Sequence, residues 1–290
     1  MSLKLPAPAK LNLFLHITGR RSDGYHNLET CFQFINVCDY LTFEATDTGN
    51  IKLTPSLEGV PDEQNLIVKA ARLLQEYTGC TQGARIQLEK KLPMGGGLGG
   101  GSSNAATTLH GLNRLWSLDL STSELEHLGL SLGADVPIFV HGHSAFASGI
   151  GEVFEEANPE ELYYLIMVPD CHVNTAKIFS DPALTRDSKT LRIRAPLSEA
   201  INWQLIETLR NDCEALVRKQ YPEINQAFKT LSQHADARLT GTGCCLFAPF
   251  NFHEDASKIA SLLPEGNHSF IAKGLNTSPL LEALSADIEQ

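Results

Sequence analysis

The chain has 290 residues, enough for two ordinary domains with a hydrophobic core each. Its composition is typical of a globular protein, because 42% of the residues are hydrophobic, 20% are charged and no segment has a biased amino-acid composition. The formal net charge of -11 disfavours nucleic acid or a membrane surface as the main partner, since both attract clustered Lys and Arg. We therefore expect any anionic ligand to be bound at a local site. We also expect a monomer or homodimer, although the charge does not determine this.

Export and membrane insertion are also disfavoured by the sequence. Residues 1–10 contain two prolines and no apolar core of a secretory signal. The longest apolar run, residues 162–168, is far shorter than the roughly 20 residues that span a bilayer. Seven cysteines without CxxC spacing are typical of buried thiols rather than of a disulfide framework. These features predict a cytoplasmic protein.

The first half of the chain has alternating strand and helix patterns. Apolar residues alternate with polar ones from Leu11 to Ile17, which predicts a half-buried strand with Lys10 and Asn12 on its other face. An Asp-Gly turn signal within residues 20–26 predicts a hairpin tip. Further strands are expected at residues 30–35, 40–44, 51–54 and 84–90, and helices at 65–77, 102–116 and 123–132.

The second half restarts after an acidic segment at residues 155–161, so we place a domain boundary there, with domains at 1–157 and 158–290. A strand is expected at 162–168, followed by helices at 198–219, 223–234 and 253–263 and by strands near Arg238, at 244–248 and near Phe270. This order predicts an α+β fold, with helices on one face of an antiparallel sheet.

The strongest chemical signal is a glycine run that leads directly into a predicted helix. Glycines let backbone N–H groups approach an anion, and a helix N-terminus adds unpaired donors and partial positive charge. A flexible linker is disfavoured, because linkers rarely run straight into a capped helix. The segment predicts a phosphate site made of Pro93, Met94, Gly95, Gly96, Gly97, Leu98, Gly99, Gly100, Gly101, Ser102 and Ser103.

Two common phosphate-binding motifs fit this run poorly. It lacks the Gly-Lys-Ser/Thr ending of a Walker P-loop. Gly95, Gly97 and Gly100 satisfy the dinucleotide pattern, and Asp119 follows at about the distance of a ribose ligand. That fold, however, needs a buried parallel strand before the glycines, whereas residues 85–89 alternate as in a one-sided antiparallel strand. A dehydrogenase is therefore disfavoured.

Residues for phosphoryl transfer are present, although spacing alone assigns none of them. The reaction needs an acceptor for the hydroxyl proton and positive charge on the moving phosphoryl group. Asp135, at the end of a predicted helix, and Lys10 suit these roles, yet spacing alone favours an ordinary surface charge for each of them.

Three further features keep two interpretations each. The turn at Thr240 and Gly241 is either a second phosphate contact or a plain hairpin turn. Tyr25 and His26 either hold a base or pack within their turn. His141 and His143 lack a third ligand at a useful spacing, so solvated histidines are favoured over a metal site, and no metal ligand is assigned.

The motifs together make the chain resemble the GHMP kinase superfamily from about Pro6 to Pro279. Three motifs occur in order, at residues 8–13, 93–106 and 239–243, with the branch signatures at 20–26 and 133–137 between them. The resemblance implies a ribosomal-protein-S5-like N-terminal domain, a ferredoxin-like C-terminal domain and an active site in the cleft between them. The pair Cys244 and Cys245 departs from the smaller residues common after the third motif and leaves the shape of that turn open.

The same resemblance implies the activity and the roles of the residues. ATP, carried with Mg²⁺, would phosphorylate the 2-hydroxyl of diphosphocytidyl-methylerythritol on the non-mevalonate route to isoprenoid precursors. Asp135 would be the base and Lys10 would keep it ionised, while Thr240 and Gly241 would contact substrate. Residues near the adenine would be Asn65, Leu66, Lys90 and Met94, and those holding the substrate would be Asn12, Tyr25 and His26.

Two alternatives remain within the resemblance. A kinase for mevalonate, homoserine or galactose is the first, and the Asp-Gly-Tyr-His tip argues against it because mevalonate and homoserine carry no base. A sensor that binds ATP and ligand without turnover is the second. The presence of both Lys10 and Asp135 argues against the sensor, which has no chemical need for the pair.

Overall fold

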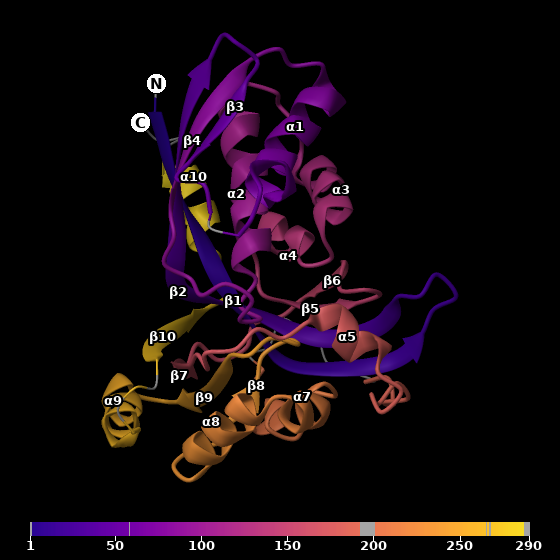
Figure 1. The fold of residues 1–290 in the computed structure, drawn as a ribbon, viewed down its shortest axis with the longest axis vertical. Helices are drawn as coiled ribbons and strands as arrows, with labels where there is room; N and C mark the ends of the chain where they lie inside the picture. Colours follow the sequence, from indigo (N-terminus) through magenta and orange to yellow (C-terminus); the bar gives the residue numbers. More distant parts are fainter. Residues whose placement is uncertain (1, 58, 192–200, 265, 267, 287–290) are drawn as a thin grey trace.

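The computed structural model describes residues 2–57, 59–191, 201–264, 266 and 268–286. Two long strands dominate the fold, and shorter elements pack around them (Figure 1). The strands are β1 Ser2–Arg20, β2 His26–Thr46, β3 Ile51–Thr54, β4 Gly83–Glu89, β5 Ala145–Ser148, β6 Val153–Glu156, β7 Tyr163–Met167, β8 Arg238–Leu239, β9 Leu246–Phe250 and β10 Ser269–Leu275. The helices are η1 Asp62–Gln64, α1 Leu66–Thr78, α2 Gly100–Leu115, α3 Thr122–Leu132, α4 Val136–His141, α5 Thr175–Ser180, α6 Trp203–Ile206, α7 Glu214–Gln220, α8 Pro222–Ser232, α9 His253–Leu262 and α10 Pro279–Ala286.

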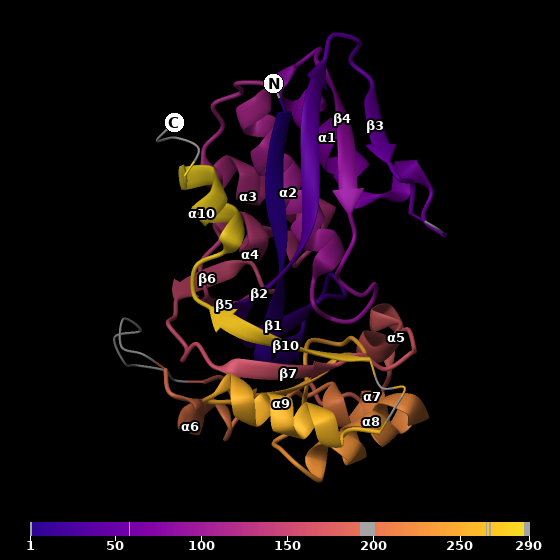
Figure 2. The same cartoon turned by 90° about the vertical axis from the view of Figure 1, so that its left-hand side faces the viewer.

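The strands form a continuous mixed sheet in the order β3-β4-β2-β10-β7-β9-β8, with β1 and β5 also paired to β2. Strand β10 joins the two halves, because it pairs antiparallel with β7 and, through Gly274 and Leu275, with β2. Helices α1 to α4 lie together at one end of the molecule, and α7, α8 and α9 lie at the other (Figures 1 and 2). The predicted α+β fold is confirmed.

Two hydrophobic clusters form the core. The first cluster joins α1, α2, α4 and β4 to residues 3–7 of β1 and includes Leu280 of α10. The second cluster joins residues 11–17 of β1 to β7, β9, α7 and α8. Strands β1 and β2 contribute to both clusters, and the C-terminal helix packs in the first one. The division at residues 157 and 158 stays a prediction.

The N-terminal hairpin is longer and more deeply buried than the sequence pattern predicted. The segments at 30–35 and 40–44, expected as two strands, belong to the single strand β2. Residues 9–17 of β1 are buried on both faces, so the expectation of a half-buried strand was wrong. Tertiary contacts cause this burial. Residues of β1 belong to both hydrophobic clusters, and the backbone N–H of Lys10 donates a hydrogen bond to the carbonyl of Leu98 in the glycine run.

The remaining elements follow the sequence closely in the first half and less closely in the second. Helices α1, α2, α3, α8 and α9 and strands β3, β4, β7 and β10 lie where they were expected. The single helix expected at 198–219 is wrong: its first residues lie outside the described residues, and the rest is two short helices, α6 and α7. The antiparallel pairing of β4 with β2 agrees with the argument against a dinucleotide fold. Among the described residues, no helix is long and apolar enough to cross a bilayer.

Candidate active site

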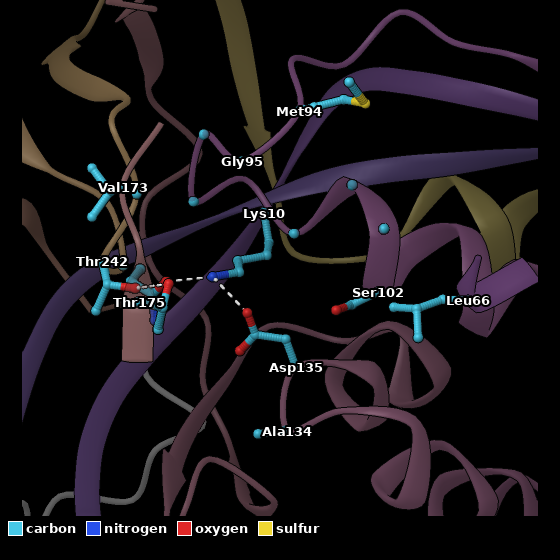
Figure 3. A pocket seen from close by; sticks show the side chains of 18 of the residues that line it. Lys10, Leu66, Met94, Gly95, Ser102, Ala134, Asp135, Val173, Thr175 and Thr242 are labelled. Atoms are coloured by element: carbon cyan, nitrogen blue, oxygen red, sulfur yellow. Dashed lines mark hydrogen bonds and ion pairs between the residues drawn. The ribbon is translucent and has the colours of Figure 1, made fainter. Parts of the chain in front are cut away.

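A pocket of about 830 Å³ opens where the glycine run, β1, the α3–α4 connection and α5 meet (Figure 3). It contains most of the predicted site residues, although they are spread over more than 230 positions of sequence, from Lys10 to Gly241. The predicted residues that line it are Lys10, Asn12, Asn65, Leu66, Lys90, Pro93, Met94, Gly95, Gly96, Gly97, Gly99, Gly100, Gly101, Ser102, Asp135 and Gly241.

Lys10 and Asp135 face one another across this pocket. The Lys10 Nζ lies 3.5 Å from Asp135 Oδ2 (Figure 3). The lysine side chain is 2% exposed and the aspartate is 45% exposed, so the ammonium is fixed by the protein while the carboxylate faces the open volume. Asp135 precedes α4 as its N-cap residue, immediately before Val136 and Pro137, so the helix start fixes its backbone. The pair therefore places the fixed Lys10 ammonium next to an accessible carboxylate.

Strand irregularities in β1 lie on both sides of Lys10 and Asn12. The pairing of β1 with β2 shifts register between Pro8 and Ala9 and again between Asn12 and Leu15. Such bulges re-aim side chains and are frequent next to active sites. The sequence alone does not locate them, because an alternating pattern fits a regular strand equally well.

Asn12 connects the lysine to both halves of the molecule. Its Oδ1 accepts a hydrogen bond from Lys10 Nζ, and its Nδ2 donates to Thr30 Oγ1 at 2.9 Å. Its backbone N–H donates to Thr240 Oγ1 at 2.9 Å. Thr240 is fully buried and does not line the pocket, so it supports Asn12 from behind. These bonds leave the Lys10 ammonium little freedom to move.

The glycine run is packed closely against the turn at residues 240–243. A Cβ on Gly97 would lie 2.5 Å from the Thr240 carbonyl oxygen, and one on Gly243 would lie 2.1 Å from the Gly97 nitrogen. The Cys245 N–H donates to the Gly96 carbonyl at 3.0 Å, and a Cβ on Gly96 would lie 2.6 Å from Cys245 Sγ. The cysteine pair is therefore buried beneath the run, and glycine is required where the two turns touch.

We expect Gly97→Ala to raise the KM for ATP by at least about tenfold and to lower stability. Gly97 has a φ of 81°, where alanine costs about 1 kcal/mol or more, and the added Cβ also meets backbone that cannot move aside. Gly79→Ala is the matched control, because Gly79 has a φ of 70° and open space around its Cβ position. Steady-state kinetics and thermal unfolding of both variants test this; an unchanged KM in Gly97→Ala would contradict the role of the close contact.

Helix α2 begins at the end of the glycine run and points its N-terminus at the pocket. Gly99 is its N-cap, with a φ of 76°, and no side chain caps the first turn. Ser102 lies beside the open volume in this turn (Figure 3). The buried Ser103 Oγ and Asn104 Oδ1 have no hydrogen-bond partner within the described part of the chain. The free backbone N–H donors of such a helix N-terminus suit the phosphates of a nucleotide.

The residues expected near the adenine lie on the same side of the pocket as this helix start. Asn65 caps α1 through its own side chain, which accepts from the Ile67 N–H at 3.0 Å, so its structural role is already filled. Lys90 binds the fully buried Asp39 carboxylate at 2.9 Å, so its ammonium is anchored inside the protein. Met94 is 58% exposed and offers a flexible apolar surface. Leu98 and Ser103 are buried and do not line the pocket.

Helix α5 and the segment before it form a wall that the sequence analysis missed. Val173 and Thr175 line the pocket, and Thr175 Oγ1 lies 2.9 Å from Thr242 Oγ1 across it (Figure 3). Phe179 lines the same wall. A six-residue helix in a polar segment has no clear apolar period; the one local signal is Asn174, which caps the helix by accepting from the Lys177 N–H.

The hairpin tip lies beyond this wall. Tyr25 is 57% exposed, and neither Tyr25 nor His26 lines the pocket. The His26 ring packs against Phe179, with the ring centres 5.2 Å apart, and its Nε2 accepts from Arg186 Nε at 3.0 Å. Burial lowers the pKa of His26, and the positive charges of Arg186 and Arg20 lower it further. The assignment of Tyr25 and His26 to a base stays a prediction.

The described residues contain no group of three or more His, Cys, Asp or Glu side chains that could hold a metal ion. His141, one of the two histidines considered for a metal pair, binds Glu126 Oε1 through Nδ1 at 3.1 Å. The Asp135 carboxylate and the Ser102 hydroxyl are two of the oxygen groups lining the pocket that suit Mg²⁺, because this ion prefers oxygen ligands and is commonly held by one or two carboxylates plus substrate phosphates.

Comparison with known proteins places these features in a family. The model of the GHMP kinases N-terminal domain matches residues 65–143, and that of the GHMP kinases C-terminal domain matches residues 195–267. A 4-diphosphocytidyl-2-C-methyl-D-erythritol kinase of Pseudomonas syringae pv. syringae is 52% identical over 278 residues, covering 96% of each chain. The enzyme of the same name from Shewanella baltica is 50% identical over 286 residues, covering 98% of each chain.

Solved structures agree with the sequence matches. A crystal structure of 4-(cytidine 5'-diphospho)-2C-methyl-D-erythritol kinase superposes with a TM-score of 0.79 at 28% identity and covers 94% of this chain and 99% of its own. The mevalonate kinase of Methanococcus jannaschii superposes with a TM-score of 0.68 at 16% identity, covering 95% and 98%, which supports the fold alone. The two-domain kinase fold expected from the motifs is thereby confirmed.

Proposed function

Because this chain belongs to the GHMP kinase family, we propose that it transfers the γ-phosphoryl group of ATP to the 2-hydroxyl of 4-diphosphocytidyl-2-C-methyl-D-erythritol. The substrate comes from the names of relatives at about half identity over nearly the whole chain. The observation that carries the chemistry is the 3.5 Å pair of Lys10 and Asp135 at a pocket bordered by the glycine run.

The reaction step follows from the positions of these two groups. The exposed Asp135 carboxylate takes the proton of the 2-hydroxyl, whose oxygen forms a bond to the γ-phosphorus while the bond to the β–γ bridging oxygen breaks and ADP leaves. The buried Lys10 ammonium lies beside this carboxylate and offsets the negative charge that spreads over the phosphoryl oxygens. Asn12 and Thr240 hold Lys10 in place.

ATP binding uses the backbone more than side chains in this proposal. The glycine run and the first turn of α2 receive the phosphates, and Leu66 and Met94 border the adenine. Mg²⁺ carried with the nucleotide would neutralise phosphate charge, and the Asp135 carboxylate and the Ser102 hydroxyl would be available to hold it. Burial of Ser103 and Leu98 makes them supports of the run rather than direct ligands.

The diphosphocytidyl end of the substrate extends toward the hairpin tip. Phe179 on the pocket wall, together with Tyr25 and His26 behind it, supplies the aromatic surfaces for the cytosine. Asn12 and Gly241 border the methylerythritol end. A cytoplasmic location belongs to the same proposal and is supported by the free thiol state of the cysteines.

We expect ADP release, coupled to an indicator reaction and run with ATP and Mg²⁺, to be strong with diphosphocytidyl-methylerythritol and to stay at background with mevalonate, homoserine and galactose. Only the first of these substrates carries a base, which the aromatic groups near the hairpin tip would hold in this proposal. Turnover with only one of the other alcohols would contradict the proposed substrate and identify that alcohol in its place. Absence of turnover on all four, with ATP still bound, would favour a binding protein.

A further inference from the structure

All three guanidinium nitrogens of Arg186 donate hydrogen bonds, four in total. Nη2 donates to the carbonyl oxygens of Phe179 at 2.9 Å and Asp181 at 2.7 Å, and Nη1 donates to Leu184 at 3.0 Å. The fourth bond runs from Nε to His26 Nε2 at 3.0 Å. The arginine therefore joins the carbonyl end of α5, which carries pocket residues, to the start of β2, which lies 160 positions earlier in the chain.

The direction of the fourth bond decides the chemical state of His26. A guanidinium has only N–H groups and donates, so His26 Nε2 is the acceptor and carries no hydrogen. In a neutral imidazole the hydrogen then resides on Nδ1. Among the described residues Nδ1 has no hydrogen-bond partner. Burial and the nearby charges of Arg186 and Arg20 lower the pKa of His26, which agrees with a neutral ring.

The position of the His26 ring suggests a function for the neutral Nδ1–H tautomer. His26 is 6% exposed and packs against Phe179, a residue of the pocket wall, so its orientation is set by packing on one side and by Arg186 on the other. The Nδ1–H is then a donor of fixed direction on a ring that lies beside Phe179. A pyrimidine with acceptors on its ring nitrogen and adjacent carbonyl, as cytosine has at N3 and O2, is suited to such a donor.

We propose that Arg186 is a positioning residue for base recognition, which fixes His26 as the neutral Nδ1–H tautomer and holds it against Phe179. The identity of the base rests on the proposed function, whereas the tautomer does not. Arg186 itself lines no part of the pocket and acts through His26. Removal of its side chain frees the ring to take either tautomer and to turn.

Nitrogen NMR of the ligand-free protein tests the tautomer directly. In protein with ¹⁵N-labelled histidine at about pH 8, well above the usual histidine pKa of about 6.5, long-range ¹H–¹⁵N spectra distinguish a protonated Nδ1 from a protonated Nε2. The His26 signals are those missing from His26→Gln. We expect the Nδ1–H pattern in the unaltered protein and a mixed or Nε2–H pattern in Arg186→Met. An Nε2–H pattern in the unaltered protein overturns the proposal.

A double-mutant cycle tests whether Arg186 acts through His26. We expect Arg186→Met to raise the KM for diphosphocytidyl-methylerythritol by about tenfold or more, the typical effect of losing a hydrogen bond to a charged group, while kcat stays within about twofold. In the His26→Gln background the same change should alter KM by less than about twofold. An equal KM effect in both backgrounds overturns the proposal, because the arginine then acts elsewhere.

Arg218→Met is the matched control for the loss of a partly buried arginine. Arg218 stacks on Phe228 and binds Glu214 at 3.2 Å in the α7–α8 pair, away from the pocket. We expect it to lower thermal stability without changing KM or the His26 spectrum. If no variant turns over a cytidylyl substrate, the proposed function fails while the spectra still decide the tautomer.

Discussion

Asp135→Asn is expected to lower kcat by about 10³-fold, within the range attributed to general-base catalysis, and to leave the fold intact. The amide keeps the shape of the side chain but cannot accept the hydroxyl proton. Asp135 is 45% exposed and its side chain does not cap α4, and the buried Lys10 ammonium, which loses the charge of its partner, keeps its hydrogen bond to Asn12 Oδ1. Coupled ADP release at saturating ATP and substrate measures the change, and equilibrium binding of ATP checks that the nucleotide site is unaltered.

The matched control is Asp255→Asn on α9. Asp255 is 50% exposed and pairs with Lys258 at 2.9 Å, so the substitution removes an accessible carboxylate beside a lysine in both cases. We expect the control to keep full activity. Near-normal kcat in Asp135→Asn would exclude Asp135 as the base, whereas an equal loss in both variants would point to a general effect of charge.

Lys10→Met is expected to lower kcat by about 10² to 10³-fold, comparable to the removal of one preorganised charge-stabilising donor, with little change in the KM for ATP. Methionine fills a similar volume but carries no charge. The ammonium is 2% exposed, and burying a cation costs several kcal/mol that its partners must offset. We therefore expect the melting temperature of Lys10→Met to change little, because the cost of burying the cation disappears while the buried Asn12 Oδ1 loses its hydrogen-bond donor.

Lys229→Met controls for the loss of one lysine, because Lys229 is exposed on α8, far from the pocket. It should change neither kcat nor the melting temperature. A large fall in the melting temperature of Lys10→Met would mean that the lysine is structural, and an unaltered kcat would remove it from the catalytic step. Together with Asp135→Asn, the pair separates proton acceptance from charge stabilisation.

The predicted supporting role of Lys10 depends on atoms that the sequence places far apart. Asn12 binds the ammonium and is itself held by Thr240, which lies 228 positions later in the chain. The glycine run and the turn at 240–243 touch so closely that neither tolerates a side chain at Gly97 or Gly243. The third motif is therefore part of the support of the first two, and it contributes Gly241 and Thr242 to the pocket surface.

The sequence by itself determined the fold class, most elements of the first half and the kinase family. The reason is that strong local signals determine these features: the Asn65 cap of α1, the glycine run before α2 and the period of β4 each act within a few residues. The same motifs named Lys10, Asp135 and the glycine run as candidates, and the structure brings them to one pocket.

Only the tertiary structure decided how these candidates are placed. It buries β1 on both faces, where an alternating pattern predicted one exposed face, because the glycine run and the C-terminal elements cover it. It adds Val173, Thr175 and Phe179 to the pocket, and it joins His26 to Arg186. Such contacts form between segments with no local pattern in common, so their energy comes from packing and hydrogen bonds across the fold rather than from any signal in neighbouring residues.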